Sequence, residues 1–71
     1  MNRNVDFRKY PLSTEVVSTI LGTGTIVAIM DQSKFPILVK FSNNRLYRFS
    51  FDGTETEFGY VKIELKTKDP P

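Results

Sequence analysis

The sequence predicts a small all-β fold, an antiparallel barrel of about five short strands. Apolar and polar residues alternate with a period of two through residues 37–41 and 46–51, which is typical of half-buried strands. Turns rich in glycine, asparagine and aspartate separate the apolar runs, and no segment shows helical periodicity over the length of a substantial helix. Because strands this few and short cannot build a sandwich of ordinary size, we expect them to curl around one core.

The 71 residues allow one domain, which we place at residues 13–66. A polar arm of mixed charge precedes it at residues 1–12, and we expect this arm to be flexible, lying loose or docking in part on the barrel. A tail at residues 67–71 ends in two prolines, which cannot donate to a β-ladder, so it is expected to be disordered.

The first two strands are expected at residues 15–19 and 25–30, where β-branched residues are frequent. A short helix capped by Ser13 or Thr14 is the alternative for the first of these segments. The second segment is apolar on both faces, which favours a central position in the sheet.

Turns define the remaining boundaries. Gly22 and Gly24 predict a bend in which the backbone takes positive φ, and residues 31–34 form a polar loop. A turn-rich connection at residues 52–59 begins with an Asp-Gly dipeptide, and the last strand follows it. In that strand Val61, Ile63 and Leu65 are expected to point inward, and Lys62, Glu64 and Lys66 outward.

The hairpin over residues 35–54 admits two registers. A two-residue loop at Asn43 and Asn44 would pair Phe41 with Leu46 and would place the apolar face of one strand against the polar face of the other. We therefore expect an odd-numbered loop or a bulge, with one asparagine in the left-handed conformation. The expected pairs are Phe41 with Tyr47, Val39 with Phe49, and Ile37 with Phe51, all of them pointing into the core.

The composition excludes several kinds of site. The chain has no cysteine and no histidine, which excludes disulfides and a Cys/His zinc site and removes the commonest general base. We find no catalytic constellation and expect neither an enzyme nor a cofactor. The N-terminus lacks the apolar run of a secretory signal and the longest apolar run is too short to cross a bilayer, so we expect a cytoplasmic protein with no membrane partner.

Two stretches carry a resemblance to known proteins. GTGTIVAIM and FPILVKFSNNRLYRFSFDG together resemble the strand-loop-strand pattern of SH3-like barrels of the KOW and Tudor type. The chain is also similar to small phage and prophage proteins of unassigned role, which share a glycine-valine strand, a YPI-x-V-x-F strand like residues 35–41 and an F-x-x-DG turn like residues 49–53. The resemblance spans roughly residues 17–65 and implies an SH3-like barrel from a phage or mobile element, acting in the host cytoplasm.

Basic residues are the first candidate binding feature, although the formal net charge is only +2. In the expected register Lys40 lies opposite Arg48 on the outward face, where like charges destabilise a ladder by a few tenths of a kcal/mol. With Lys34, Arg45, Lys62 and Lys66, these side chains predict a positive strip for phosphate or an acidic protein. The simpler interpretation is that they are solvated outer positions of an antiparallel sheet.

Aromatic residues are the second candidate feature. Tyr10, Phe35 and Tyr60 fall outside the inward set, and exposed rings among basic residues stack the bases of single-stranded nucleic acids. The simpler interpretation is that Phe35 and Tyr60 cover the two ends of the barrel, since aromatic residues dominate the cores of small domains.

Apolar residues that point outward are the third candidate binding feature. Leu38 and Leu46 face outward in the expected register, with Ile26 or Ile29 beside them. Gathered in one place, such residues mark an interface, whereas scattered singly they carry no information. We expect a monomer or a weak homodimer.

These features predict a non-enzymatic binding module. By resemblance it is a phage or mobile-element accessory protein that docks on a host or phage protein and modulates it. The alternative is a nucleic-acid-binding barrel that uses the basic outer face. The two differ in their response to salt, because contacts to phosphate weaken steeply as salt rises and an apolar docking surface is largely insensitive to it.

Overall fold

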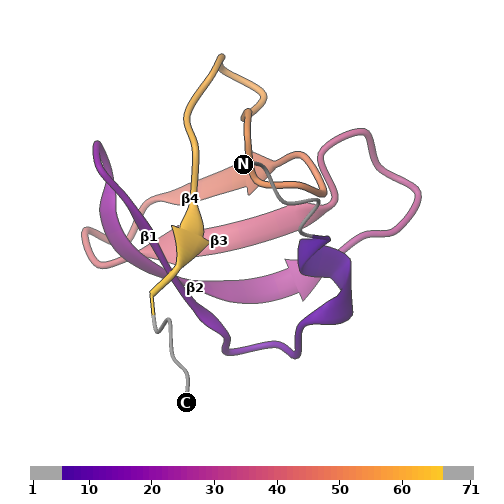
Figure 1. The fold of residues 1–71 in the computed structure, drawn as a ribbon, viewed down its shortest axis with the longest axis horizontal. Helices are drawn as coiled ribbons and strands as arrows, with labels where there is room; N and C mark the ends of the chain where they lie inside the picture. The colour runs from indigo at the N-terminus through magenta and orange to yellow at the C-terminus, as the bar shows by residue number, and fades with distance from the viewer. Residues whose placement is uncertain (1–5, 67–71) are drawn as a thin grey trace.

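Five antiparallel strands form one coiled sheet in the computed structural model, which describes residues 6–66 (Figure 1). A 3-10 turn, η1 (Phe7–Lys9), precedes them and lies beside the end of β2. The strand order is β4-β3-β2-β1-β5, which leaves β4 and β5 as the two edges. The strands are β1 (Glu15–Ser18), β2 (Gly22–Ile29), β3 (Ile37–Phe41), β4 (Leu46–Phe49) and β5 (Glu64–Leu65).

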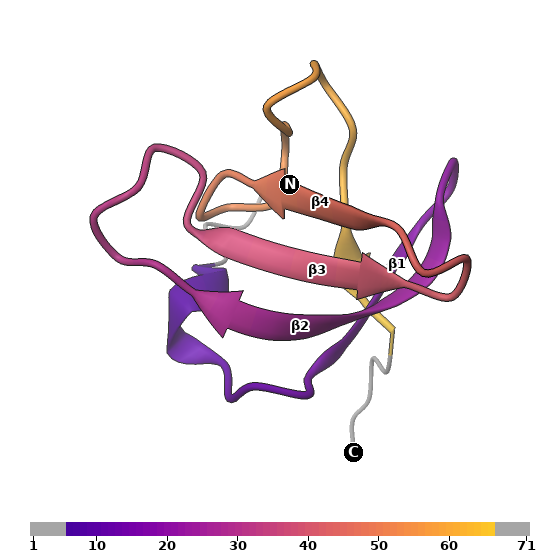
Figure 2. The same cartoon turned by 180° about the vertical axis from the view of Figure 1, so that it is seen from behind.

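The predicted all-β fold is confirmed, but hydrogen bonds do not close the sheet into a barrel. The final strand is only two residues long and pairs with β1 alone. Single contacts bridge the gap between the edges: Phe49 pairs with Thr56, and the Ile63 amide donates to the Gly53 carbonyl at 2.8 Å. The sheet therefore coils around its core, while the segment between β4 and β5 covers the open side (Figure 2).

The core is one apolar cluster on the inner face of this coiled sheet. Its buried members come from every strand but β5, from η1 and from the segment before β5: Phe7, Val16, Ile26, Ile37, Val39, Phe41, Phe49 and Ile63. Five of the residues predicted to point inward, Ile37, Val39, Phe41, Phe49 and Ile63, are thus confirmed. Val61 and Leu65 are half-buried against the cluster, while Lys62, Glu64 and Lys66 are exposed, so the alternation predicted for the last strand is confirmed as well.

Glycines act differently at the start of β2 than the sequence suggested. Gly22 has a φ of +85°, as expected. Gly24 does not take positive φ, and it is instead a buried strand residue required for space. A Cβ atom there would lie 2.7 Å from side-chain atoms of both Val39 and Phe41. A bulge at Val27 then separates the pairs that β2 makes with β3, and bulges of this kind increase the coiling of a sheet.

The β3–β4 hairpin has an odd-numbered loop, as predicted, but its register differs from the predicted one by two residues. Asn44 takes the left-handed conformation with a φ of 70°. The turn is tightened by two bonds, from the Asn44 amide to the Phe41 carbonyl at 2.8 Å and from the Arg45 amide to Asn43 Oδ1 at 2.9 Å. Both registers place the same residues inward because the side-chain period is two. The observed pairs are Ile37 with Phe49, Leu38 with Arg48, Val39 with Tyr47 and Lys40 with Leu46.

Phe51 is not a core residue, contrary to the prediction. The shift in register brings Phe49 opposite Ile37, and the chain turns immediately afterwards, which leaves Phe51 46% exposed. Phe7 takes the inner position instead: it is buried, and its amide donates to the Phe51 carbonyl at 2.8 Å. The Arg8 guanidinium lies 4.9 Å from the centre of the Phe51 ring on the outside.

Of the two expectations for the arm, loose or docked in part, the structure supports docking for the stretch around Phe7. Asp6 caps η1 by accepting from the Arg8 amide at 3.0 Å, and its carboxylate also pairs with the Arg8 guanidinium at 2.9 Å. That side-chain hydrogen bond lowers the pKa of Asp6. Residues 1–5 and 67–71, the rest of the predicted arm and the whole predicted tail, lie outside the described residues.

The turn after β4 provides a test by pH. The Asp52 carboxylate accepts hydrogen bonds from the Ser50 and Thr54 hydroxyls, both at 2.8 Å. Burial raises the pKa of Asp52, but these bonds outweigh it and hold the pKa below its usual value. Because the folded-state pKa is depressed, the stabilisation is present above the unfolded pKa of about 3.9 and is lost as pH falls through the folded value.

We expect Asp52→Asn to lower the free energy of unfolding by about 1 kcal/mol near pH 7. The difference from the wild type should shrink at acidic pH, as the pH falls through the depressed folded-state pKa and the wild-type carboxyl takes up its proton. Urea unfolding at neutral and at acidic pH measures this, with Asp31→Asn, in the exposed β2–β3 loop, as the control. An equal loss at both pH values would show that the ionised carboxylate does not stabilise the turn.

Candidate functional site

The outer face of β3 and β4 carries the first predicted cations, in a different arrangement from the one expected. Lys40 lies opposite Leu46, and Arg48 lies opposite Leu38, so the predicted direct pair of Lys40 and Arg48 is wrong. The two cations are diagonal neighbours, which separates them by about 7–8 Å between Cα atoms and relieves most of the repulsion. The reason is the two-residue change in register at the Asn43-Asn44 turn.

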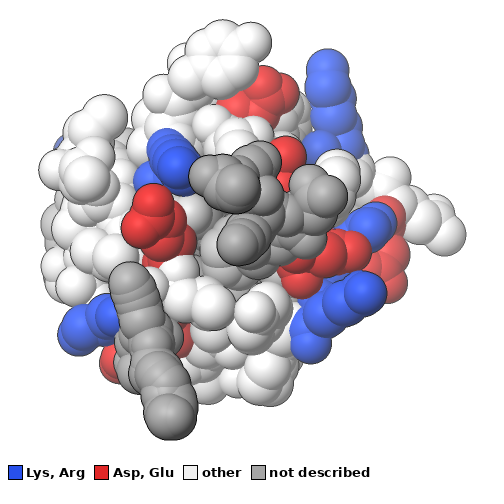
Figure 3. Space-filling view, viewed as in Figure 1, with Lys and Arg blue, Asp and Glu red and all other residues white. Residues whose placement is uncertain are grey.

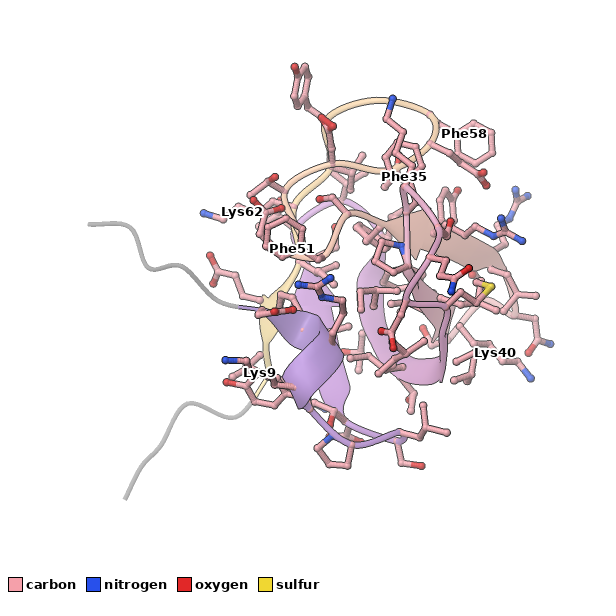
Figure 4. The ribbon with its side chains drawn as sticks, turned by 90° about the vertical axis from the view of Figure 1, so that its right-hand side faces the viewer. Lys9, Phe35, Lys40, Phe51, Phe58 and Lys62 are labelled. Carbon is pink, nitrogen blue, oxygen red and sulfur yellow. The ribbon has the colours of Figure 1, made fainter. Side chains whose placement is uncertain are left out.

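The other predicted cations lie elsewhere. Lys62 and Lys66 flank β5 at the opposite edge of the sheet, and each pairs with a carboxylate: Lys62 with Glu64 at 3.6 Å, and Lys66 with Glu15 at 3.9 Å. Figure 4 shows Lys40 and Lys62 on opposite sides of the molecule. The predicted positive strip is thus divided in two.

Charges on the face seen in Figure 1 are also mixed, with Lys and Arg interspersed among Asp and Glu (Figure 3). The cations at β3 and β4 are different in this respect. Among residues 6–66, no carboxylate lies within ion-pair distance of Lys40, Arg45 or Arg48. These three side chains are therefore available to an outside anion.

The predicted aromatic candidates do not gather. Tyr60 is 87% exposed, whereas Phe35 is half-buried with the Lys34 ammonium 5.7 Å from its ring centre. Tyr10 is half-buried against Phe7. The prediction that Phe35 and Tyr60 serve a binding face stays a prediction.

An open depression lies along β4, the edge strand. It is lined by Arg45 at the end of the hairpin loop, by Leu46 and Tyr47 of the strand, and by Phe58 from the loop after the strand. Because Leu46 and Tyr47 point to opposite faces of an edge strand, a depression lined by both lies at its free edge. We call these four residues the β4 edge site.

The aromatic part of this site is held by the core. Tyr47 packs edge-on against the buried Phe41, with ring centres 5.7 Å apart, and Phe58 packs edge-on against Tyr47 at 5.8 Å. Phe58 is nevertheless 74% exposed. Its ring therefore packs on Tyr47 and still keeps a large exposed apolar surface. An edge-to-face contact of this kind contributes about 0.5–1.5 kcal/mol.

A tight turn presents Phe58 at this place. The Thr56 hydroxyl accepts from the Phe58 amide at 2.9 Å, and the Thr56 amide donates to the Gly59 carbonyl at 2.7 Å. Thr56 is itself buried and pairs with Phe49, so the turn is attached to β4. The Glu57 amide adds a bond to the Arg48 carbonyl at 3.3 Å.

Sequence reasoning found half of this site. Arg45 and Leu46 were among the predicted binding residues. Tyr47 was predicted to point into the core, and it does pack there, half-buried, but its part in this site was missed, as was Phe58. The signal for Phe58 is an aromatic residue within a polar, turn-rich segment, where no alternation predicts an inward position.

Ile26 and Ile29 do not accompany the outward leucines as expected, since Ile26 is buried and Ile29 packs against the core. Leu38 is half-buried on the outer face.

Comparison with known proteins gives no further guidance, since no family model, curated protein or solved structure matches the chain. Among residues 6–66, no three His, Cys, Asp or Glu side chains are grouped as a metal ion would require. Nor is there, in the same part of the chain, a helix of the length and apolar character needed to cross a membrane.

Proposed function

We propose that this chain is a non-enzymatic binding module that docks on another protein through the β4 edge site. The observation that carries the proposal is Phe58, an aromatic ring that is 74% exposed and yet packs edge-on against Tyr47. A packed ring loses little conformational entropy when a partner covers it, which is how rigid aromatic anchors contribute to affinity.

The composition of the site supports docking on a protein. Aromatic residues and arginine are enriched at the centres of protein interfaces and among their hot spots. Here Tyr47, Phe58 and Arg45 surround one depression, and Leu46 adds a side chain that is 55% exposed. Apolar residues gathered in this way mark an interface, whereas single ones do not.

Nucleic-acid binding is less well supported. The predicted basic strip is divided between two sides of the molecule, and the two lysines near β5 are paired with carboxylates. A phosphate backbone requires a continuous run of cations for high affinity. Lys40, Arg45 and Arg48 make a smaller positive area that suits an acidic protein segment.

We further propose that the fold is an SH3-like barrel left open between its edges. One core enclosed by a coiled five-stranded antiparallel sheet supports this, with Phe7 and the segment after β4 covering the gap. A phage or mobile-element accessory role that modulates a host or phage protein remains a proposal based on sequence resemblance.

The docking proposal predicts that Phe58→Ser and Leu46→Glu weaken capture of a protein partner. Immobilised wild-type protein is incubated with nuclease-treated lysate of the source organism at low and physiological salt. We expect each variant to weaken the captured interaction at least about tenfold, since exposed anchors of this kind contribute 1–4 kcal/mol. Their unfolding free energies should change by less than about 1 kcal/mol, because both side chains are largely exposed.

Leu12→Glu is the matched control, because Leu12 is also 55% exposed but precedes β1, far from β4 in the sheet order. It should capture the partner as the wild type does. Equal capture by all four proteins would contradict the docking proposal. Retention of oligonucleotides alone, lost as salt rises, would favour the nucleic-acid alternative instead.

A further inference from the structure

The free edge of β4 carries unpaired backbone groups at Leu46. The Phe41 amide donates to the Arg45 carbonyl at 2.9 Å, which makes Phe41 and Arg45 a hydrogen-bonded pair. In an antiparallel ladder such pairs alternate with pairs whose N–H and C=O groups point away from each other. The next pair, Lys40 with Leu46, is of the second kind, so the Leu46 amide and carbonyl point away from β3.

The other end of this edge confirms the alternation. Arg48 lies two residues beyond Leu46, and its carbonyl points outward and accepts from the Glu57 amide at 3.3 Å. The turn at Thr56–Gly59 therefore covers the edge of β4 at Arg48 but does not extend as far as Leu46. Within the described chain no backbone group reaches Leu46, so one outward-facing donor and acceptor remain beside Phe58.

We infer that the partner binds by strand addition, as an extended acidic segment that pairs with β4 at Leu46. This inference rests on the proposed function and names its partner class. Strand addition uses main-chain hydrogen bonds for affinity and pockets for alternate side chains for specificity. The β4 edge offers both, because the depression adjoins the unpaired backbone groups.

The side chains around the edge specify an alternating sequence. Side chains of an added strand share faces with the β4 residues beside them. On one face they meet Tyr47 and Phe58, which favours aromatic or β-branched residues. On the other face they meet Leu46 and Arg48, with Lys40 one strand further in on β3, and these two cations have no carboxylate partner among residues 6–66. Acidic and apolar residues should therefore alternate.

A second copy of this chain fits the edge less well. Pairing of β4 with β4 of another copy would bring Arg48 of both molecules to one seam, with Lys40 of each copy one strand away on the same face. Like charges close to each other across a ladder are destabilising, and no carboxylate of the site compensates them. Charge thus favours an acidic segment over self-association.

Amide hydrogen exchange of ¹⁵N-labelled protein tests the inference. In the free protein the Leu46 amide should exchange much faster than those of Tyr47 and Phe49, which face β3. The probe is a pool of capped heptapeptides in which Glu alternates with Phe, Tyr or Val. One matched pool has Lys in place of Glu, and another has Pro at the central position, which removes a ladder donor.

We expect the acidic pool to slow exchange of the Leu46 amide at least about tenfold and to shift the amides of residues 45–47 and 58. The lysine and proline pools should not do so, nor should the acidic pool with Phe58→Ser protein. Leu12→Glu protein should respond as the wild type does.

Three results would overturn the inference of an added acidic strand. Shifts around Phe58 without slower exchange at Leu46 would mean that the ligand docks on the surface and adds no strand, so the proposed function would stand without this inference. If millimolar peptide neither shifted these amides nor slowed exchange at Leu46, the inference would also be refuted. The docking proposal is decided separately, by whether capture of a partner depends on Phe58. If the Leu46 amide exchanged slowly in concentrated protein without peptide, the occupant of the β4 edge would be a second copy of the chain.

Discussion

Gly53→Ala is expected to lower the free energy of unfolding by about 3 kcal/mol, which is most of the stability of a domain this small. Gly53 has a φ of +73°, where an L-residue is strained by about 1–2 kcal/mol. An added Cβ would also lie 2.5 Å from the Phe7 ring and 2.9 Å from the Ile63 side chain. Neither group can move freely, because both are buried in the core.

Gly22→Ala separates the two causes. Gly22 has a similar φ of +85°, but no atom lies within 4 Å of the position its Cβ would take. This variant should lose only the conformational part, about 1 kcal/mol. Urea unfolding followed by far-ultraviolet circular dichroism gives both values. Equal losses would mean that the Phe7 ring does not pack on Gly53 in solution.

Phe7→Ala is expected to leave the protein largely unfolded at 25 °C. Phe7 is 2% exposed, and removing a buried phenylalanine costs about 3–5 kcal/mol, which matches the whole stability expected of a core this small. Phe7→Leu should remain folded with a loss of about 1 kcal/mol, because it keeps most of the apolar volume. The dispersion of ¹H–¹⁵N spectra and urea unfolding measure the two variants.

Phe51→Ala is the matched control for Phe7→Ala. Phe51 is 46% exposed and contacts Arg8, so its removal should cost less than about 1 kcal/mol. Sequence reasoning predicted the opposite ranking, with Phe51 in the core and Phe7 in a flexible arm. A larger loss for Phe51→Ala than for Phe7→Ala would restore that interpretation and contradict the structure.

Local patterns predicted which side each strand turns to the core. The alternation at residues 37–41 and 46–49 defined the inner face, and the parity of the hairpin loop followed from it, with an asparagine in the left-handed conformation. These features depend on neighbours in the chain, so the sequence contains them. The predicted hairpin register was wrong because a shift of two residues leaves every side chain on the same face, so alternation does not distinguish the two registers.

The candidate site shows the same division. Leu46 could be predicted as exposed because it alternates with inward residues, and Arg45 because it lies at the hairpin turn. That Phe58 packs beside Tyr47 could not, since the contact depends on how the loop from residue 50 to residue 63 returns across the edge of the sheet. The division of the basic residues has a similar cause: the position of β5 beside β1 carries Lys62 and Lys66 away from Lys40.

The sequence by itself therefore determined the all-β class, most of the strands and the inner face of each, because period-two alternation and turn residues act within a few residues. Only the tertiary structure decided the hairpin register, the incomplete closure of the sheet, the burial of Phe7 in place of Phe51 and the exposure of Phe58. Each of these depends on which distant side chain fills a given space in the core, and packing at that range leaves no periodic signal in the chain.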